Sequence, residues 1–155
     1  MIRPTTPEET TLLVSLTEAT GLFKPLEVEA LTEVFADYFA SNQDLGHRSV
    51  TAEQDGVVMG FAYYAPAAMT DRTWYLYWIA VRKDVQARGL GTELLKFVEK
   101  DIREHQGRVL FIETGSLPHY EKTRQFYIKN QYEKHAVLKD YYADGESMVV
   151  FRKAL

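Results

Sequence analysis

The chain has 155 residues, of which 46% are hydrophobic and 26% charged, and its net charge is −4. This composition predicts a single soluble globular domain over residues 1–155. The lack of cysteine excludes disulfides, a thiolate nucleophile and sulfur-ligated metal. Mild acidity without a Lys/Arg cluster argues against nucleic acid as a partner. The apolar runs are too short for a membrane span, and the start has no hydrophobic signal region, so we expect a cytoplasmic protein.

The first part of the chain predicts a short strand at Ile2-Arg3 and two helices. Thr6–Glu9 is typical of a helix start, with a capping Thr, a Pro in the first position and a Glu three residues after the cap. This helix would run to about Thr20, and a second would run from Pro25 to about Asn42. The side chains expected to face inward are Leu12, Leu13 and Leu16 in the first helix and Leu31, Val34, Phe35 and Tyr38 in the second.

Three strands are predicted next. Arg48–Gln54 and Val57–Tyr64 flank Asp55-Gly56, a two-residue hairpin signal, and therefore form an antiparallel pair. Pro66 to Arg72 is expected to be a loop, and Thr73–Val81 is a strand because it is rich in aromatic and β-branched residues.

The second half of the chain alternates helices and strands. The predicted elements are a helix Leu90–His105, a strand Val109–Thr114, a helix His119–Lys129, a strand Tyr132–Leu138, a turn Asp144-Gly145 and a strand Ser147–Arg152. The whole order is β-α-α-β-β-β-α-β-α-β-β. It predicts an α+β fold in which helices flank a mixed sheet.

A glycine-rich segment, Gln86–Thr92, connects a predicted strand to a predicted helix. Such a turn presents unpaired backbone N–H groups at the positive end of the helix, where they suit a phosphate. Gly89 and Gly91 would let the main chain approach an anion without an intervening Cβ. The segment lacks the Lys-Ser/Thr of a P-loop and the third glycine of a dinucleotide fingerprint. It therefore predicts a phosphate-bearing cofactor held in another way.

With this turn after the fourth strand, the element order resembles the GNAT superfamily of N-acetyltransferases over nearly the whole chain. Gln86, Gly89 and Gly91 fit the superfamily's Gln/Arg-x-x-Gly-x-Gly/Ala signature, and Phe126-Tyr127 lies in the later helix. The resemblance implies a largely antiparallel sheet of about seven strands, whose fourth and fifth strands splay apart. Asn130-Gln131 replaces the superfamily's usual glycine, so we expect Asn130 in a left-handed conformation.

The cosubstrate implied by the resemblance is acetyl-CoA. Its pyrophosphate would bind the amides of Ala87 to Thr92, and its pantetheine would run beside Ile79 to Val81. The cofactor-binding residues implied are Ile79, Ala80, Val81, Gln86, Ala87, Arg88, Gly89, Leu90, Gly91 and Thr92.

Acetyl transfer to an amine benefits from a base for the amine and a proton for the departing thiolate. By resemblance Tyr127 is the general acid, whereas the residues alone favour simple packing beside Phe126. Glu113 is the candidate base because it interrupts an otherwise apolar strand; the alternative is a solvent-side glutamate. The four histidines are isolated, so we expect no metal.

The sequence therefore predicts direct transfer of an acetyl group from acetyl-CoA to a primary amine of a small molecule or a protein. Two alternatives are a non-catalytic acyl-CoA-binding regulatory module of the same fold and a structural domain whose Gly-Leu-Gly only caps a helix. The resemblance also allows a homodimer. The sequence identifies neither the acceptor nor whether the acyl group is slightly longer than acetyl.

Overall fold

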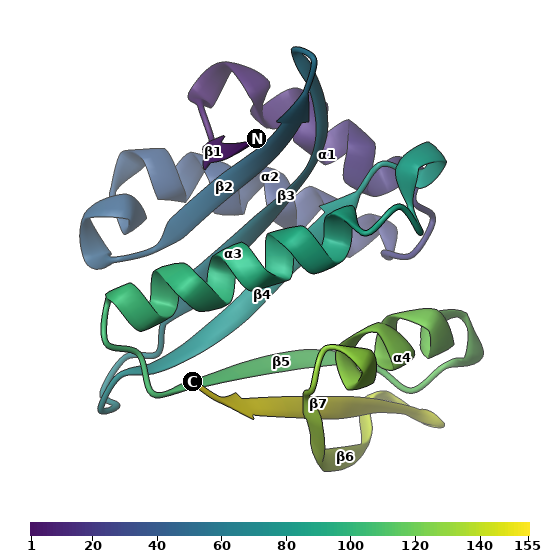
Figure 1. The fold of residues 1–155 in the computed structure, drawn as a ribbon. Coiled ribbons are helices and arrows are strands. Elements are labelled where there is room, and N and C mark those ends of the chain that lie inside the picture. Colours follow the sequence, from purple (N-terminus) through teal and green to yellow (C-terminus); the bar gives the residue numbers. More distant parts are fainter.

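The computed structural model describes all residues 1–155, which form one seven-stranded sheet with helices on both faces (Figure 1). The strands are β1 Ile2–Pro4, β2 Arg48–Gln54, β3 Val57–Pro66, β4 Thr73–Val81, β5 Val109–Gly115, β6 Glu133–Ala143 and β7 Glu146–Ala154. The helices are α1 Thr10–Ala19, α2 Pro25–Ala40, α3 Leu90–Glu104 and α4 Glu121–Lys129. The strand order is β1-β2-β3-β4-β5-β7-β6, and only β4 and β5 pair in parallel. The predicted fold class and element order are confirmed.

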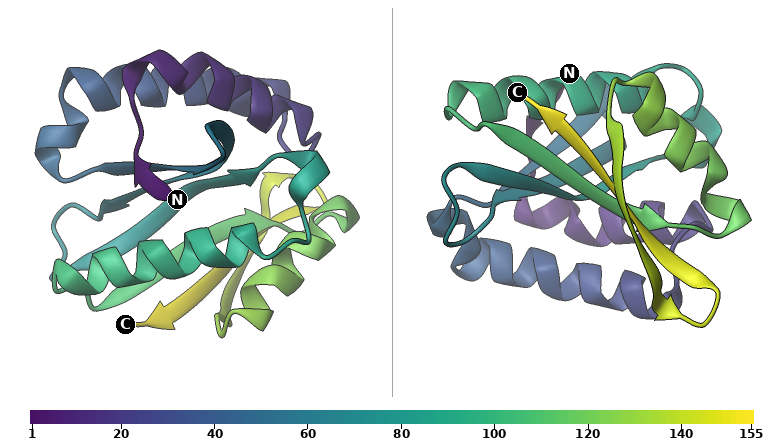
Figure 2. Two further views of the ribbon diagram at one scale, coloured as in Figure 1. Left: turned by 45° about the horizontal axis from the view of Figure 1, so that its top comes forward. Right: turned by 90° about the horizontal axis from the view of Figure 1, so that it is seen from below.

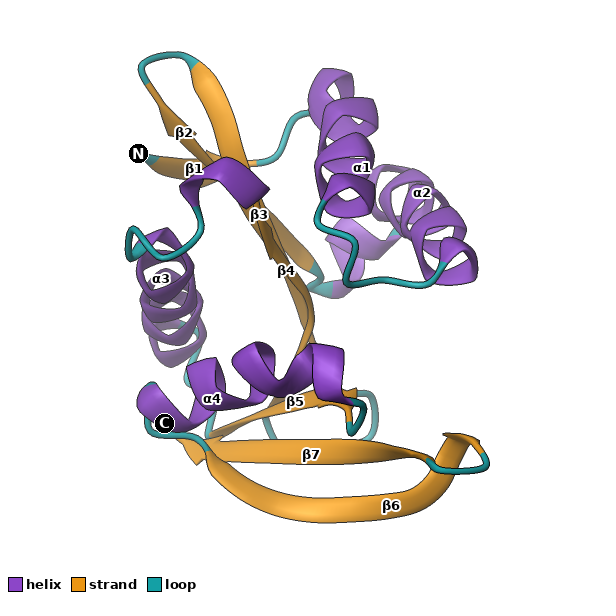
Figure 3. Ribbon diagram, turned by 90° about the vertical axis from the view of Figure 1, so that its right-hand side faces the viewer, coloured by secondary structure: helices purple, strands orange, loops and turns teal.

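The sheet separates two hydrophobic cores. Helices α1 and α2 cover one face, and α3 and α4 cover the other (Figures 2 and 3). The core under α1 and α2 contains Leu13, Leu31, Phe35 and Phe61. The larger core under α3 and α4 contains Leu94, Leu95, Val98, Ile102 and Leu110. Each fully buried side chain of this size contributes roughly 1.5–3 kcal/mol through the apolar surface that it removes from water.

Several predicted boundaries and faces are corrected by the structure. The chain first makes a 3-10 turn at Pro7–Glu9, and α1 follows at Thr10. Leu12 does not face inward: its side chain is 53% exposed, because the contacts with α2 and the sheet are made by Leu13 and Leu16. The strand expected at Tyr132–Leu138 runs from Glu133 to Ala143. Its regular pairing with β7 ends at Leu138, and Ala143 pairs again with Glu146 beside the Asp144-Gly145 turn.

The end of α4 also differs from expectation. Asn130 has φ −91° and is not left-handed; Gln131 takes that conformation instead, with φ 72°. The Asn130 side chain donates from Nδ2 to the carbonyl of Phe126 at 2.8 Å. This bond satisfies a carbonyl of the last helical turn, and the chain takes the left-handed conformation that ends the helix one residue later, at Gln131.

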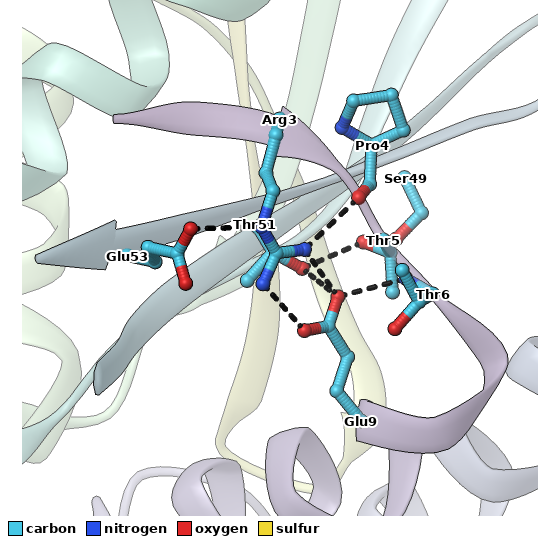
Figure 4. Close-up of polar contacts among 8 residues, drawn as sticks. All are labelled: Arg3, Pro4, Thr5, Thr6, Glu9, Ser49, Thr51 and Glu53. Carbon is cyan, nitrogen blue, oxygen red and sulfur yellow. Dashed lines mark hydrogen bonds and ion pairs between the residues drawn. The ribbon is translucent and has the colours of Figure 1, made fainter. Parts of the chain in front are cut away.

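The start of the chain is fixed to the sheet by a partly buried polar network (Figure 4). Arg3 donates from both terminal nitrogens to the Glu9 carboxylate, at 3.0 and 2.9 Å. The same carboxylate accepts the Thr6 N–H and the Thr51 hydroxyl, both at 2.8 Å. Burial opposes ionisation of Glu9, but the hydrogen bonds from Arg3, Thr6 and Thr51 outweigh it and lower its pKa. The network therefore holds β1, the first turn and β2 together through an ionised carboxylate.

The site is positioned by two irregularities in β4. Tyr63 of β3 lies opposite Trp78, but Tyr64 lies opposite Leu76, so Tyr77 is an extra residue that forms a β-bulge. On the other side, β4 pairs with β5 only from Thr73 to Leu76. The remainder of that edge, Tyr77 to Val81, has no strand partner, and the two strands diverge as the resemblance implies (Figures 1 and 3).

Candidate functional site

A cleft of about 1150 Å³ opens where β4 and β5 separate. Its walls come from the free half of β4, the end of β5, the face of α4 and the segment between α1 and α2. The Gln86–Thr92 turn forms one end of the cleft. Four segments that are far apart in the sequence thus converge on one concave surface, as is usual for ligand sites.

The glycine-rich turn presents free hydrogen-bond donors. No backbone N–H from Gln86 to Thr92 donates to another backbone group, because the first helical bond of α3 runs from Glu93 N to Gly89 O. Gly89 caps the helix with φ 84°, and Ala87 has φ 71°. Successive donors in such a turn, at the positive end of a 15-residue helix, form a concave surface suited to a diphosphate.

The glycines and Gln86 have separate local roles. Gly89 needs its left-handed backbone, although a Cβ there would meet nothing within 4 Å. At Gly91 a Cβ would lie 3.3 Å from the Phe126 ring, so this glycine lets α3 approach α4. The Gln86 amide donates from Nε2 to the carbonyl of Val81 at 3.1 Å and therefore fastens the turn to the end of β4.

Most of the residues predicted to bind the cofactor line this cleft. They are Ile79, Ala80, Val81, Gln86, Ala87, Gly89, Gly91 and Thr92. Two predicted residues do not: Leu90 packs its side chain against the larger core, and Arg88 is exposed to solvent outside the cleft walls. Their backbone N–H groups still belong to the turn. The binding roles themselves remain predictions.

Tyr127 reaches the cleft from α4. Its ring is 4% exposed and packs against Phe126, Tyr132 and Phe151, with centroid distances of 5.4, 6.0 and 5.5 Å. Its hydroxyl has no hydrogen-bond partner in the protein, and no buried polar side-chain atom is left without a partner, so the hydroxyl opens onto the cleft. Burial raises the pKa of this phenol above its usual value, which keeps it protonated and able to donate.

Glu113 lies in the same cleft on the opposite side of the sheet. Its neighbours Ile112 and Thr114 face the core that contains Tyr127, and strand alternation therefore turns Glu113 toward the side of α1 and α2. The carboxylate is open to the cleft, but it has lost part of its hydration, and this burial raises its pKa. A carboxylate with a raised pKa is a stronger base than an ordinary glutamate. The structure thus brings both predicted catalytic residues to one cleft.

Aromatic groups line the α1/α2 side of the cleft, and an ion pair lies nearby. Phe23 packs on Trp78 at 5.3 Å between ring centroids, and Tyr120 lines the cleft beside His119. Lys24 pairs with Glu146 at 2.7 Å and so links the start of α2 to the β6–β7 hairpin. No local pattern marks these residues, because the sheet topology alone brings the start of α2 to this hairpin.

Two further structural findings bear on function. None of the helices is both long and apolar enough to span a bilayer. No three His, Asp or Glu side chains gather in an arrangement that could hold a metal ion.

Residues 14–143 match the acetyltransferase (GNAT) family. The structure is similar to a GNAT-family protein from Desulfovibrio desulfuricans, with a TM-score of 0.94, 34% identity, and coverage of 99% of this chain and 98% of that one. It shares its fold with an aminoglycoside 6′-N-acetyltransferase solved with coenzyme A (TM-score 0.79, 19% identity, coverage 99% and 96%). A ribosomal-protein-alanine N-acetyltransferase from Brucella melitensis gives a TM-score of 0.78, 18% identity, and coverage of 100% and 99%. No curated protein matches the chain by sequence.

Proposed function

This chain belongs to the acetyltransferase (GNAT) family, and we propose that it moves an acetyl group from acetyl-CoA directly to a primary amine. The observation that carries the proposal is the unbroken run of free N–H groups from Gln86 to Thr92 at one end of a large cleft. A diphosphate matches this run in charge and in hydrogen bonding. The chain is an acyltransferase by family, so a purely regulatory acyl-CoA-binding role has no observation in its favour.

The unpaired edge of β4 supports binding of the rest of the cosubstrate. Tyr77 to Val81 offers backbone donors and acceptors toward the gap left by β5. The pantetheine arm contains amide groups, so it can pair with this edge as an added strand would. Ile79, Ala80 and Val81 line the cleft beside it. In the proposed complex the diphosphate lies on the turn, and the thioester lies deeper, between β4 and β5.

The chemistry is divided between the two faces of the sheet. The amine nitrogen attacks the thioester carbonyl, the C–N bond forms and the C–S bond breaks. Glu113, on the α1/α2 side, takes the amine proton directly or through water, and Tyr127, on the α3/α4 side, donates a proton to the sulfur. Since the chain has no cysteine, an acyl-enzyme on sulfur is excluded and transfer is direct.

The acceptor is proposed to be an amine that is cationic in solution. Glu113 lines the cleft on the acceptor side, and the chain as a whole carries a charge of −4. Negative charge near a cleft raises the local concentration of cations. Structural neighbours are named for acetylating aminoglycosides and an alanine of a ribosomal protein, so small-molecule and protein amines are both acceptor candidates.

Three measurements test this function. Calorimetric titration should show CoA binding to the intact protein, and a screen that follows CoA release should find turnover with amino acids, polyamines, aminoglycosides or peptides. At a CoA concentration 100 times Kd, the protein should gain about 2.7 kcal/mol of stability in a thermal unfolding experiment. If CoA neither binds nor stabilises the folded protein, the proposal is wrong.

A further inference from the structure

A second, smaller pocket adjoins the cleft. Its volume is about 180 Å³, and it shares Tyr77 and Trp78 with the cleft. Its other walls come from α2, the segment after α2, and β3. They are Val34, Asp37, Asn42, His47 and Tyr63. Because a water takes up about 30 Å³ in the liquid, this volume holds a group of several heavy atoms.

The pocket owes its position to the bulge in β4. Neighbouring residues of a regular strand point to opposite faces of the sheet. Here Tyr77 stacks on Tyr75, with 5.6 Å between ring centroids, and Trp78 packs against the core under α1 and α2. Because Tyr77 is the extra residue, both rings lie on the same side and stand between the cleft and the pocket.

The pocket has an acidic group and no basic one. The Asp37 carboxylate forms no ion pair or hydrogen bond with another side chain, and no Lys or Arg lines the pocket. His47 holds its Nδ1 2.6 Å from the Tyr63 hydroxyl, and burial lowers the pKa of His47, so the imidazole is neutral at pH 7. The lining therefore carries one negative charge, the neutral polar groups of Asn42, His47 and Tyr63, and the aromatic rings of Tyr77 and Trp78, which together favour a cation.

The two carboxylates lie on the two sides of this aromatic wall, because Glu113 lines the cleft, Asp37 lines the pocket, and Tyr77 and Trp78 line both. Burial, Tyr75 and Glu113 raise the pKa of Tyr77. Burial, Tyr38, Tyr77 and Asp37 raise the pKa of Tyr63. Glu113 thus acts on one side of the wall and Asp37 on the other. An acceptor spanning the wall would meet a carboxylate at each end.

We propose that this pocket is a distal acceptor subsite that binds a second ammonium group, so that the enzyme prefers acceptors with two amines. The inference rests on the proposed function, because the first amine must lie beside Glu113 in the cleft. Asp37 neutralises the second ammonium, and the faces of Tyr77 and Trp78 receive the chain between the two amines. Asp37 is a specificity residue and takes no part in the transfer of the acetyl group.

The test compares two probes that differ by one ammonium group, 1,5-diaminopentane and 1-aminopentane. Calorimetry measures the binding of each to the wild-type protein, to Asp37→Asn and to Asp44→Asn. Asp44 is the matched control because it is exposed, lies nearby in the segment after α2 and does not line the pocket. The wild type and Asp44→Asn should bind the diamine about 10-fold more tightly than the monoamine. In Asp37→Asn the two affinities should be within about 2-fold of each other.

Equal affinity for the two probes in the wild type would overturn the subsite, as would a preference that survives Asp37→Asn or the absence of any diamine binding. These results leave the proposed function intact if CoA still binds the folded protein and monoamines are acetylated. Conversely, a protein that prefers the diamine through Asp37 but does not bind CoA would retain the pocket and lose the acetyl-transfer proposal.

Discussion

Replacing Tyr127 with Phe should separate catalysis from packing. The substitution removes only the hydroxyl, which has no hydrogen-bond partner in the protein, and it keeps the ring contacts with Phe126, Tyr132 and Phe151. We therefore expect the free energy of unfolding to change by less than about 0.5 kcal/mol. If the hydroxyl protonates the departing sulfur, kcat should fall by about 100-fold, which corresponds to about 2.7 kcal/mol of lost transition-state stabilisation.

The neighbouring Tyr132 supplies a matched control. Its hydroxyl donates to the buried Glu99 carboxylate at 2.8 Å, on the side of the ring cluster away from the cleft walls. Tyr132→Phe leaves that carboxylate oxygen without this donor and should cost about 1.5–3 kcal/mol of stability. Its kcat should stay within about 2-fold of the wild type. The two variants are thus expected to show opposite patterns of stability and rate.

The assay follows the rate of CoA release with an acceptor from the screen, and urea unfolding measures the stability of each protein. Single-turnover kinetics must show that chemistry limits kcat, because slow product release would hide a loss in the chemical step. With chemistry rate-limiting, an unchanged kcat in Tyr127→Phe would refute the general-acid role. Tyr127 would then be a packing residue of the larger core.

Three other variants probe the turn, the candidate base and the N-terminal network. The double variant Gly89→Val, Gly91→Val should weaken CoA binding by at least about 10-fold, because Val strains the left-handed backbone at residue 89 and meets the Phe126 ring of α4 at residue 91. The control Gly145→Val, also at positive φ but in a distant hairpin, should bind CoA as the wild type does; calorimetry measures both affinities. Glu113→Gln should lower activity most near neutral pH, and the activity should recover partly at high pH; superimposable pH–rate profiles of the two proteins would remove the base role. Because burial raises the pKa of Glu113, its ionised carboxylate destabilises the fold above the unfolded-state pKa, so the variant should also melt at a higher temperature at pH 7. Glu9→Gln should lower the free energy of unfolding by about 1–2 kcal/mol at pH 7. Since the pKa of Glu9 is lowered in the folded state, the stability difference between variant and wild type should disappear as the pH falls below that folded-state pKa. A difference in urea unfolding that stays constant down to pH 3 would contradict this expectation.

The sequence predicted the fold where local signals agree with the final packing. The hairpin turn at Asp55-Gly56, the glycine turn at Gln86–Thr92 and the period of α3 each act over a few residues, and each is found as expected. Glu99 shows what such signals leave out. Its i,i+4 ion pair with Arg103 is present at 3.8 Å, but the residue is 4% exposed and its carboxylate also accepts from Tyr132 and Lys153. Only the packing of β7 and the chain after α4 over α3 brings those partners within reach.

The candidate site was predicted in its parts and not in its arrangement. The residue types of Glu113 and the glycine turn indicate a base and an anion site, and the family resemblance implies an acid at Tyr127. The structure brings all three to one cleft. The acceptor side was not predictable from local patterns, because it combines the start of α2, the bulge in β4 and the β6–β7 hairpin. A bulge depends on the register of two strands, and a continuous aromatic and apolar run such as Trp74 to Val81 fits a regular strand equally well.

One extra residue in β4 accounts for the geometry on both sides of the sheet. Without it, Tyr77 and Trp78 would lie on opposite faces, and the residues after them would exchange faces. Ile79 and Val81 would then turn toward α1 and α2, and Ala80 would turn toward α3, so neither core could form as it does. The bulge is therefore required by the packing of the second half of β4. The same irregularity turns two adjacent rings to one side of the sheet and sets the boundary between cleft and pocket. The acceptor selection that we propose at this wall therefore depends on a register shift that the hydrophobic cores maintain.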